Sequence, residues 1–244
     1  PDFCPICCSP LEENDSGNLL ECINPDCDNN ISGKAATFFK RIGIKGVRQL
    51  TIHKMIEADT YKGMISILAW AKQPDAFTVT IAKDTPGVTE KTTGKICNDL
   101  HQALMVDGVR DFDFMSAMAI PSMDANRFRV LFRHFGFIDI FCNLCFRTGS
   151  NSSAYLMADI DELKAIIHSL NISNWGEGLN SILFKWLDDE RNARTLAAFN
   201  MYCKIISSYN PGNMDYADMS VCVTGSCKVM ARKLLETQLK DKGI

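Results

Sequence analysis

Five cysteines fall within the first 27 residues, and their spacing constrains what this part of the chain can fold into. Two residues separate Cys4 from Cys7 and four separate Cys22 from Cys27, with fourteen residues between the pairs. If the intervening segment forms a β-hairpin, the pairs meet and offer four thiolates to one ion at tetrahedral geometry. We therefore predict a structural zinc site formed by these four residues, with Cys8 as a turn residue. The alternatives are reduced cysteines facing solvent, or a disulfide pair.

The charge of the chain is distributed unevenly, although its net value is only −3. Residues 1–33 carry seven acidic residues and no lysine or arginine, whereas residues 34–56 carry six lysines or arginines and no acidic residue. We place a domain boundary at this change, near Ser32 and Gly33. The acidic first segment is expected to act as a structural clip, and the basic segment is a candidate for nucleic-acid contact.

No apolar run reaches the roughly 18 residues that a membrane-spanning helix needs, so we expect no membrane contact. The chain begins without a charged and then apolar leader, and clustered cysteines outside a secreted protein indicate metal more readily than disulfides. We expect an intracellular location, in cytoplasm or nucleoid. With 244 residues, 46% of them hydrophobic, the chain is long enough for more than one compact unit.

Residues 34–210 show the apolar periodicity of α-helices, interrupted by four turns of similar sequence. These turns open the segments 44–55, 85–96, 120–131 and 172–183, which we call hairpins 1 to 4. The pattern is typical of helix-hairpin-helix motifs. A glycine in the turn allows a positive φ and lets backbone N–H groups approach a phosphate, while the dipole of the following helix adds to the attraction. Such motifs hold the DNA backbone and do not read its sequence.

Each hairpin departs from the ideal pattern. Arg48 and Thr89 stand where hairpins 1 and 2 would have a second glycine, and Asn174 stands for the first glycine in hairpin 4. Hairpin 3 has Ser122 and Asp124; this carboxylate would repel phosphate and suggests a packing role. For any single hairpin the alternative is an ordinary helix–helix turn, and we expect hairpins 1 and 2 to carry most of the DNA contact. The candidate DNA-binding residues are Lys45, Gly46, Val47, Arg48, Gly87, Val88, Thr89, Lys91, Asn126, Arg127, Asn174, Gly176 and Gly178.

The order of these modules resembles the C-terminal half of an NAD-dependent DNA ligase. The segment CPICCSPL…CINPDC is similar to the zinc finger of that family, with Cys8 in place of the usual glycine. Residues 119–136 align without gaps on the third hairpin of the family, and residues 219–244 are similar to the start of a BRCT domain, with a first strand closed by residues 223–225. Viral and phage versions of a family often drift in this way, so the resemblance extends to a viral or phage member of the family.

The resemblance implies a mainly α protein with three parts: a Cys4 zinc finger at 1–32, a four-motif helix-hairpin-helix domain at 33–212 and an incomplete BRCT segment at 216–244. It implies a part that clamps nicked duplex DNA irrespective of sequence, in an enzyme that joins 3′-hydroxyl and 5′-phosphate ends during replication and repair. The implied partner is the adenylation and OB-fold portion of the ligase, in cis or as a separate subunit. NAD and magnesium would act only in the complete enzyme.

The sequence lacks the residues that carry ligase chemistry. The nucleotidyl-transfer motif Lys-x-Asp-Gly is absent, and the nearest segments, at 83–85 and 240–243, do not fit it. We therefore assign no catalytic and no NAD-binding residue, and expect this chain alone not to seal a nick. It is either a C-terminal fragment or one subunit of a split ligase. The alternative is a non-enzymatic DNA-repair adaptor that binds nicked or branched DNA, and a weaker one is a protein-interaction scaffold. We expect Cys142 and Cys145 to be buried thiols, and Trp175 to pack hairpin 4.

Overall fold

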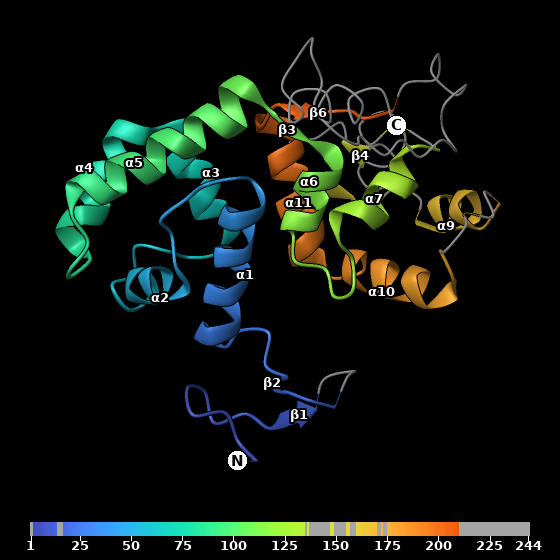
Figure 1. Cartoon of the computed structure of the whole chain (residues 1–244), viewed down its shortest axis with the longest axis horizontal. Coiled ribbons are helices and arrows are strands. Elements are labelled where there is room, and N and C mark those ends of the chain that lie inside the picture. Colours follow the sequence, from blue (N-terminus) through green and yellow to red (C-terminus); the bar gives the residue numbers. More distant parts are fainter. Residues whose placement is uncertain are drawn as a thin grey trace, which may run out of the picture. The chain divides into compact units, whose positions relative to one another are not determined.

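The computed structural model describes residues 2–13, 17–134, 136, 147–148, 155–156, 160–169, 172 and 175–209. The chain divides into two compact units. Unit 1 comprises Pro1–Val109, Asp113–Ile120 and Ala198–Lys204, and unit 2 comprises Arg110–Phe112, Pro121–Ala197 and Ile205–Ile244. The described part is mainly helical, as predicted (Figure 1). The expected BRCT segment, Asn174, Cys142 and Cys145 lie outside the described residues.

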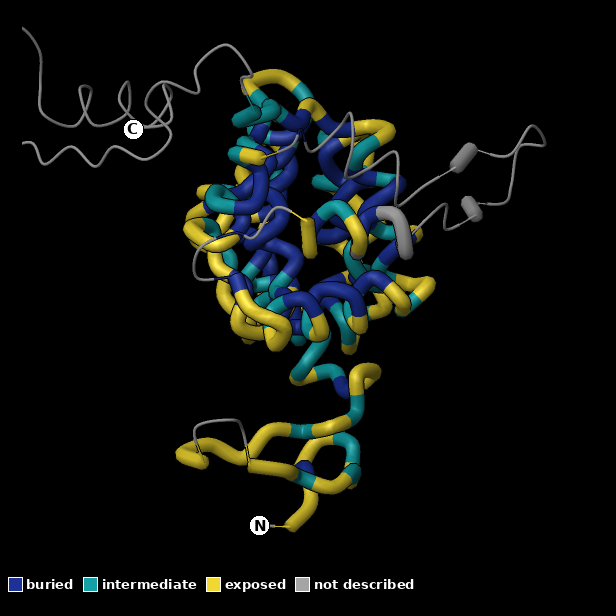
Figure 2. Tube along the Cα trace, turned by 90° about the vertical axis from the view of Figure 1, so that its right-hand side faces the viewer, coloured by how far each residue is buried: buried dark blue, intermediate teal, exposed yellow. Residues whose placement is uncertain are grey.

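Unit 1 begins with a small antiparallel hairpin, as the sequence predicts. Strand β1 (Leu11–Glu13) pairs with β2 (Leu20–Cys22), and Leu11 lies opposite Cys22. The described side chains of both strands are half-buried or exposed, and Figure 2 shows this N-terminal segment largely in the colour of exposed residues. A two-stranded hairpin without an apolar core is marginal in water, so this segment needs another source of stability.

Helix α1 (Asp28–Arg41) begins immediately after Cys27. Ala35, Phe38 and Phe39 are buried at helical spacing, and Lys40 and Arg41 lie in the last turn, where cations favour the helix dipole. Residues 32 and 33 lie inside this helix, so the change in charge occurs along one continuous element. The domain boundary placed there stays a prediction.

The rest of unit 1 is mainly helical, and its core consists of aromatic and aliphatic side chains. Rings of Phe38 and Phe199 pack edge to face with centroids 5.4 Å apart, and the Phe114 ring lies 5.7 Å from Phe199. The helices are α2 (Gln49–Glu57), α3 (Met64–Lys72), α4 (Pro74–Asp84) and α5 (Glu90–His101). The residues of β3 (Val109–Arg110) and α6 (Asp111–Ala117) are divided between the two units. Helices α4 and α5 lie side by side in Figure 1, and the Thr93 hydroxyl donates to the Thr78 carbonyl over 2.9 Å.

Helix α5 continues into a π-helix, η1 (Gln102–Asp107), which the sequence analysis does not anticipate. As in any helix, the last carbonyl groups of η1 have no partner within the helix. The Leu104 carbonyl accepts from the backbone N–H of Lys204 over 2.7 Å, and the Val106 carbonyl accepts from Lys204 Nζ over 2.9 Å. Gly108, at a φ of 89°, ends the helix.

Unit 2 contains α7 (Ala125–Phe132), α9 (Ile160–Ser169), α10 (Glu177–Leu187) and most of α11 (Glu190–Tyr202), with β6 (Ile205–Ile206) following. Strands β4 (Arg147–Thr148) and β5 (Tyr155–Leu156) form an antiparallel pair that the sequence analysis does not anticipate. Stacked rings of Phe128 and Phe132, with centroids 5.9 Å apart, are part of its buried core. Within the described residues of both units, no helix combines the length and apolarity needed to cross a membrane.

Candidate metal centre and nucleic-acid interface

The four predicted cysteines come together at one point. The sulfur atoms of Cys4, Cys7, Cys22 and Cys27 all lie within 4.8 Å of one another. Two of the distances are 3.8 Å, between Cys4 and Cys27, and 3.4 Å, between Cys7 and Cys22. Four sulfurs placed tetrahedrally at about 2.3 Å from a zinc ion would be about 3.8 Å apart. The cluster therefore fits a single four-coordinate metal ion.

Each half of the cluster is positioned by local backbone structure. Cys4 and Cys7 lie in a tight turn, in which the backbone N–H of Cys8 donates to the Cys4 carbonyl over 2.9 Å. Cys22 ends β2, and Cys27 directly precedes α1. The Asn30 side chain ties the second half together, because its Nδ2 donates to the carbonyls of Cys22 and Asn24, each over 2.8 Å.

Cys8 lies outside the group of four and is exposed. Its φ of 57° is in the left-handed region, which glycine adopts without strain and other residues adopt at a cost. This conformation explains why a glycine would suit the position, as it does in the family that the finger resembles. Cys8 thus has the place of a turn residue.

The pKa values of the clustered cysteines are shifted in opposite directions. Hydrogen bonds from Ser9, first from its side chain and then from its backbone, lower the pKa of Cys7 to about 6. Burial raises the pKa of Cys22 and of Cys27, and backbone N–H groups of Asn29 and Asn30 at the start of α1 partly oppose this at Cys27. A metal ion would compensate the desolvation of these sulfurs and hold them as thiolates.

The hairpin turns share one register in the described residues. The first position is buried in all four, at Ile44, Thr85, Ile120 and Ile172. The third position has a left-handed φ wherever it is described, namely 87° at Gly46, 76° at Gly87 and 56° at Ser122. The fifth position is the N-cap of the following helix, at Arg48, Thr89, Asp124 and Gly176. The four turns therefore start their helices in the same way, including the one in which serine stands for glycine.

The N-caps separate the hairpins into two kinds. Thr89 accepts from the backbone N–H of Thr92 over 3.3 Å, and Asp124 accepts from that of Arg127 over 2.9 Å. Helices α5 and α7 are thus capped by their own side chains. Arg48 and Gly176 provide no such side-chain cap to α2 and α10. The first N–H groups of α2 and α10 are accordingly open to an external acceptor.

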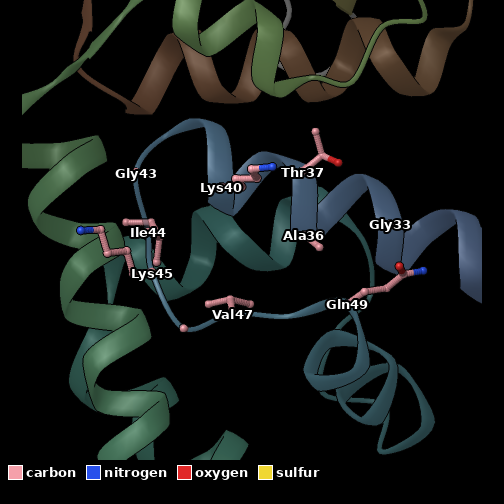
Figure 3. Close-up of a pocket in the computed structure, with 10 residues that line it drawn as sticks. Gly33, Ala36, Thr37, Lys40, Gly43, Ile44, Lys45, Val47 and Gln49 are labelled. Carbon is pink, nitrogen blue, oxygen red and sulfur yellow. The ribbon is translucent and has the colours of Figure 1, made fainter.

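Hairpin 1 borders a surface hollow of about 550 Å³ between α1 and its turn (Figure 3). Lys40 of α1 and Lys45 of the turn line it, together with three glycines. A Cβ on Gly46 would meet nothing within 4 Å, so the space above this turn is open. Helix α2 has no acidic residue in its first turn. Of the described hairpins, this one combines open N–H groups, cations and free space.

Hairpin 3 uses its polar side chains internally. Arg129 donates from Nη1 to Asn126 Oδ1 over 2.9 Å, and its guanidinium lies 4.3 Å from the centroid of the Phe112 ring. Asp124, which would repel a phosphate, caps α7 instead. Of the DNA-binding candidates predicted here, Asn126 thus contacts its own helix and Arg127 is exposed.

Hairpin 4 is open at its N-cap but carries little positive charge. Gly176 and Gly178 are exposed, and Glu177 between them pairs with His168 at 3.2 Å. An acidic residue in the first turn of α10 would weaken attraction for a phosphate. The indole of Trp175 is buried below this turn, as predicted from its place in the pattern.

One cation outside the predicted DNA-binding residues lies beside hairpin 2. Lys54 of α2 places its Nζ 3.3 Å from the point that a Cβ on Gly87 would occupy. Exposed Lys91, in the first turn of α5, is the cation that the sequence predicts for this hairpin. The only sequence signal for Lys54 is its membership of the basic segment 34–56, because the contact joins residues that are 33 positions apart.

The cysteine cluster and the repeated turns together define a class of protein: a small module with four cysteines that could hold a metal ion, followed by helices that begin at turns of one pattern. Comparison with known proteins finds similarity to a DNA ligase from Chlamydia pneumoniae, with 23% identity over 249 aligned residues. The alignment covers all of this chain but only 32% of the ligase, so the chain spans about a third of that protein. No protein-family model matches the chain.

Proposed function

We propose that this chain is the DNA-binding, nick-clamping part of an NAD-dependent DNA ligase. The observation that carries this proposal is the similarity to a DNA ligase along the whole chain, including the region of its clustered cysteines. The ligase would join 3′-hydroxyl and 5′-phosphate ends in duplex DNA. Its adenylation chemistry, with NAD and magnesium, would belong to a module outside these residues, and no chemical step is assigned to them.

Hairpin 1 would make the main contacts with the DNA backbone. A phosphate above Gly46 would meet the open N–H groups at the start of α2 and the positive end of its dipole. Lys40 and Lys45 would neutralise its charge. These contacts reach phosphate and not base edges, so binding would be independent of sequence and would weaken steeply with salt.

The four cysteines would hold a structural zinc ion. All four positions of a tetrahedral ion would be filled by sulfur, which leaves none for water or substrate. The ion would supply the stability that the β1–β2 hairpin lacks, because its strands bury so little apolar surface.

The finger would contact protein in preference to DNA. Residues 1–33 carry seven acidic and no basic residues. Large apolar side chains are exposed on the same segment: Phe3, Ile6, Leu19, Leu20 and Ile23. Acidic charge repels DNA, whereas exposed apolar side chains favour a protein partner. The adenylation and OB-fold portion of the ligase is the partner that we propose for this surface.

The test is binding of a labelled nicked duplex of random sequence, followed by anisotropy over a series of salt concentrations. We expect binding that does not depend on sequence, with a steep linear fall of log affinity against log salt. Lys45→Gln should weaken this binding while the melting profile stays native. Gly46→Val should weaken it too, but at a cost in stability, because valine is strained at a φ of 87°. Absence of binding at low salt would reject the proposal.

A non-enzymatic DNA-repair adaptor is the second candidate, because the lack of Lys-x-Asp-Gly in these residues is expected of an adaptor and of the ligase part alike. The two candidates differ in one assay. The adenylation and OB-fold portion of the Chlamydia pneumoniae ligase can be mixed with this chain, a nicked duplex, NAD and magnesium. Nick sealing above the level of that portion alone supports the ligase part, whereas DNA binding without any gain in sealing supports the adaptor.

A further inference from the structure

Lys54 lies against the turn of a hairpin other than its own. Its Nζ is 3.3 Å from the position of a Cβ on Gly87, the left-handed residue of hairpin 2. Its side chain has no ion-pair partner among the described residues, unlike Lys62, which pairs with Asp59, and Lys95, which pairs with Asp99. A cation half-buried against a turn, without a carboxylate beside it, can still bind an anion.

The fold fixes this arrangement through the end of α2. The Thr60 hydroxyl bonds to the Met55 carbonyl over 3.1 Å and to the hydroxyl of Thr85 over 2.9 Å. Thr85 is the buried first residue of hairpin 2, and its carbonyl accepts from the Val88 N–H across the turn over 3.2 Å. The last turn of α2 and the turn of hairpin 2 are therefore joined directly, which holds Lys54 near Gly87.

Hairpin 2 lacks the cations that hairpin 1 carries in its own turn. In the shared register, Lys45 and Arg48 of hairpin 1 correspond to Pro86 and Thr89 of hairpin 2. The first turn of α5 also contains Glu90, which opposes Lys91. Lys54 thus places a positive charge where the sequence of hairpin 2 has none.

We propose that Lys54 and the Gly87 turn form one composite site for a backbone phosphate of duplex DNA. Helix α2 then serves two hairpins: its N-terminus faces the phosphate of hairpin 1, and Lys54 supplies the charge for hairpin 2. The two hairpins hold successive parts of the backbone as a coupled pair. This inference rests on the proposed DNA-binding function.

The experiment compares the full chain with Lys54→Gln, and with Lys95→Gln as a matched control that removes the same charge from an ion pair on α5. Binding of a random-sequence nicked duplex is measured across a salt series. Lys54→Gln should weaken binding about 3- to 10-fold at low salt and reduce the salt slope by about 1, as for loss of one phosphate contact. Lys95→Gln should stay within about twofold of the wild type. Lys54→Arg, which keeps the charge, should retain most of the affinity.

A second measurement tests whether the two residues share one phosphate. Gly87→Val should weaken binding by itself, and the double variant with Lys54→Gln should bind little worse than Gly87→Val alone, because both changes remove the same contact. Additive effects would overturn the composite site, as would a Lys54→Gln variant indistinguishable from Lys95→Gln. If the wild type does not bind DNA, the proposed function and this inference both fail. If the wild type binds DNA but the variants do not behave as stated, only this inference fails.

Discussion

The indole N–H of Trp175 donates to Oδ1 of Asn180 over 2.6 Å, and both residues are buried. Trp175 occupies the hydrophobic position of hairpin 4, and Asn180 lies in the first turns of α10. This buried hydrogen bond joins the turn to the helix that follows it. In the described part of hairpin 4, the glycines at the start of that helix, Gly176 and Gly178, are exposed to solvent.

Trp175→Phe should destabilise the chain while preserving most of the apolar contact. The phenyl ring cannot donate, so Asn180 Oδ1 would be left buried without its partner, which costs about 1–3 kcal/mol. Chemical denaturation followed by circular dichroism measures the loss. The control is the double variant with Asn180→Ala: if the bond matters, its loss of stability is smaller than the sum of the single losses. Fully additive losses would show that the indole contributes only apolar packing.

Asp124→Ala should lower stability without weakening DNA binding. Asp124 accepts from the Arg127 N–H at the start of α7, and loss of such a cap costs about 1 kcal/mol. Asp124→Asn is the matched control, because asparagine caps about as well and removes the charge. If hairpin 3 is a packing unit, neither variant lowers affinity for a nicked duplex. A clear loss of affinity in both would mean that hairpin 3 contacts DNA in a way that needs this carboxylate.

Removal of the metal should unfold the finger and leave the helices intact. The described strands of the finger bury little apolar surface, whereas α1 buries Phe38 and Phe39 in the helical core. Elemental analysis should give one zinc per chain, and Cys22→Ser should abolish it. Helical circular dichroism should persist after chelation, while protease cleavage within residues 1–27 increases. Cys8→Ser is the control and should keep the metal; zinc content that depends on Cys8 would contradict the assignment.

The local features of this chain were predictable from sequence, and the long-range ones were not. Cysteine spacing predicted the cluster because two short half-motifs and a hairpin fix its geometry. The same holds for hairpin 3, where the pattern placed Ser122 at a glycine position and the backbone there is left-handed. Contacts between elements distant in the chain produce no spacing pattern in the sequence. Lys54 lies beside Gly87 because the end of α2 packs against the turn of hairpin 2. The π-helix η1 likewise involves bonds to Lys204, almost a hundred residues further along the chain.

The spacing pattern also did not predict which partners individual side chains contact. Asn126 is one of the two DNA-binding candidates that the sequence analysis names in hairpin 3. In the structure its amide oxygen accepts from Arg129, whose guanidinium lies over Phe112. Whether a polar side chain faces outward or bonds to its neighbour depends on rotamers and packing, which a spacing pattern does not encode.

The buried Asp111 side chain should make the stability of unit 2 depend on pH. Its carboxylate is buried and accepts from the backbone N–H groups of Phe112 and Ser208, each over 2.8 Å. Burial raises the pKa of Asp111, although hydrogen bonds from Ser208 and Phe112 partly oppose the shift. A carboxyl with a raised pKa holds its proton longer in the folded state than in the unfolded state. Its contribution to the free energy of unfolding therefore falls as the pH rises from about 4 through the raised pKa, and stays level above it.

Asp111→Ala would leave two buried N–H groups without an acceptor, so it should cost about 2 kcal/mol or more at neutral pH. Asp111→Asn should cost less, because its amide oxygen can still accept from one of the two groups while its amide nitrogen faces the other. Urea denaturation of the wild type and of both variants between pH 4 and 8 measures these differences. The stability advantage of the wild type over Asp111→Ala should be largest at the acid end and shrink as the pH rises, because only the wild type titrates at this position. An advantage that grows with pH would mean that the carboxylate, and not the neutral acid, is the form that the fold favours at residue 111.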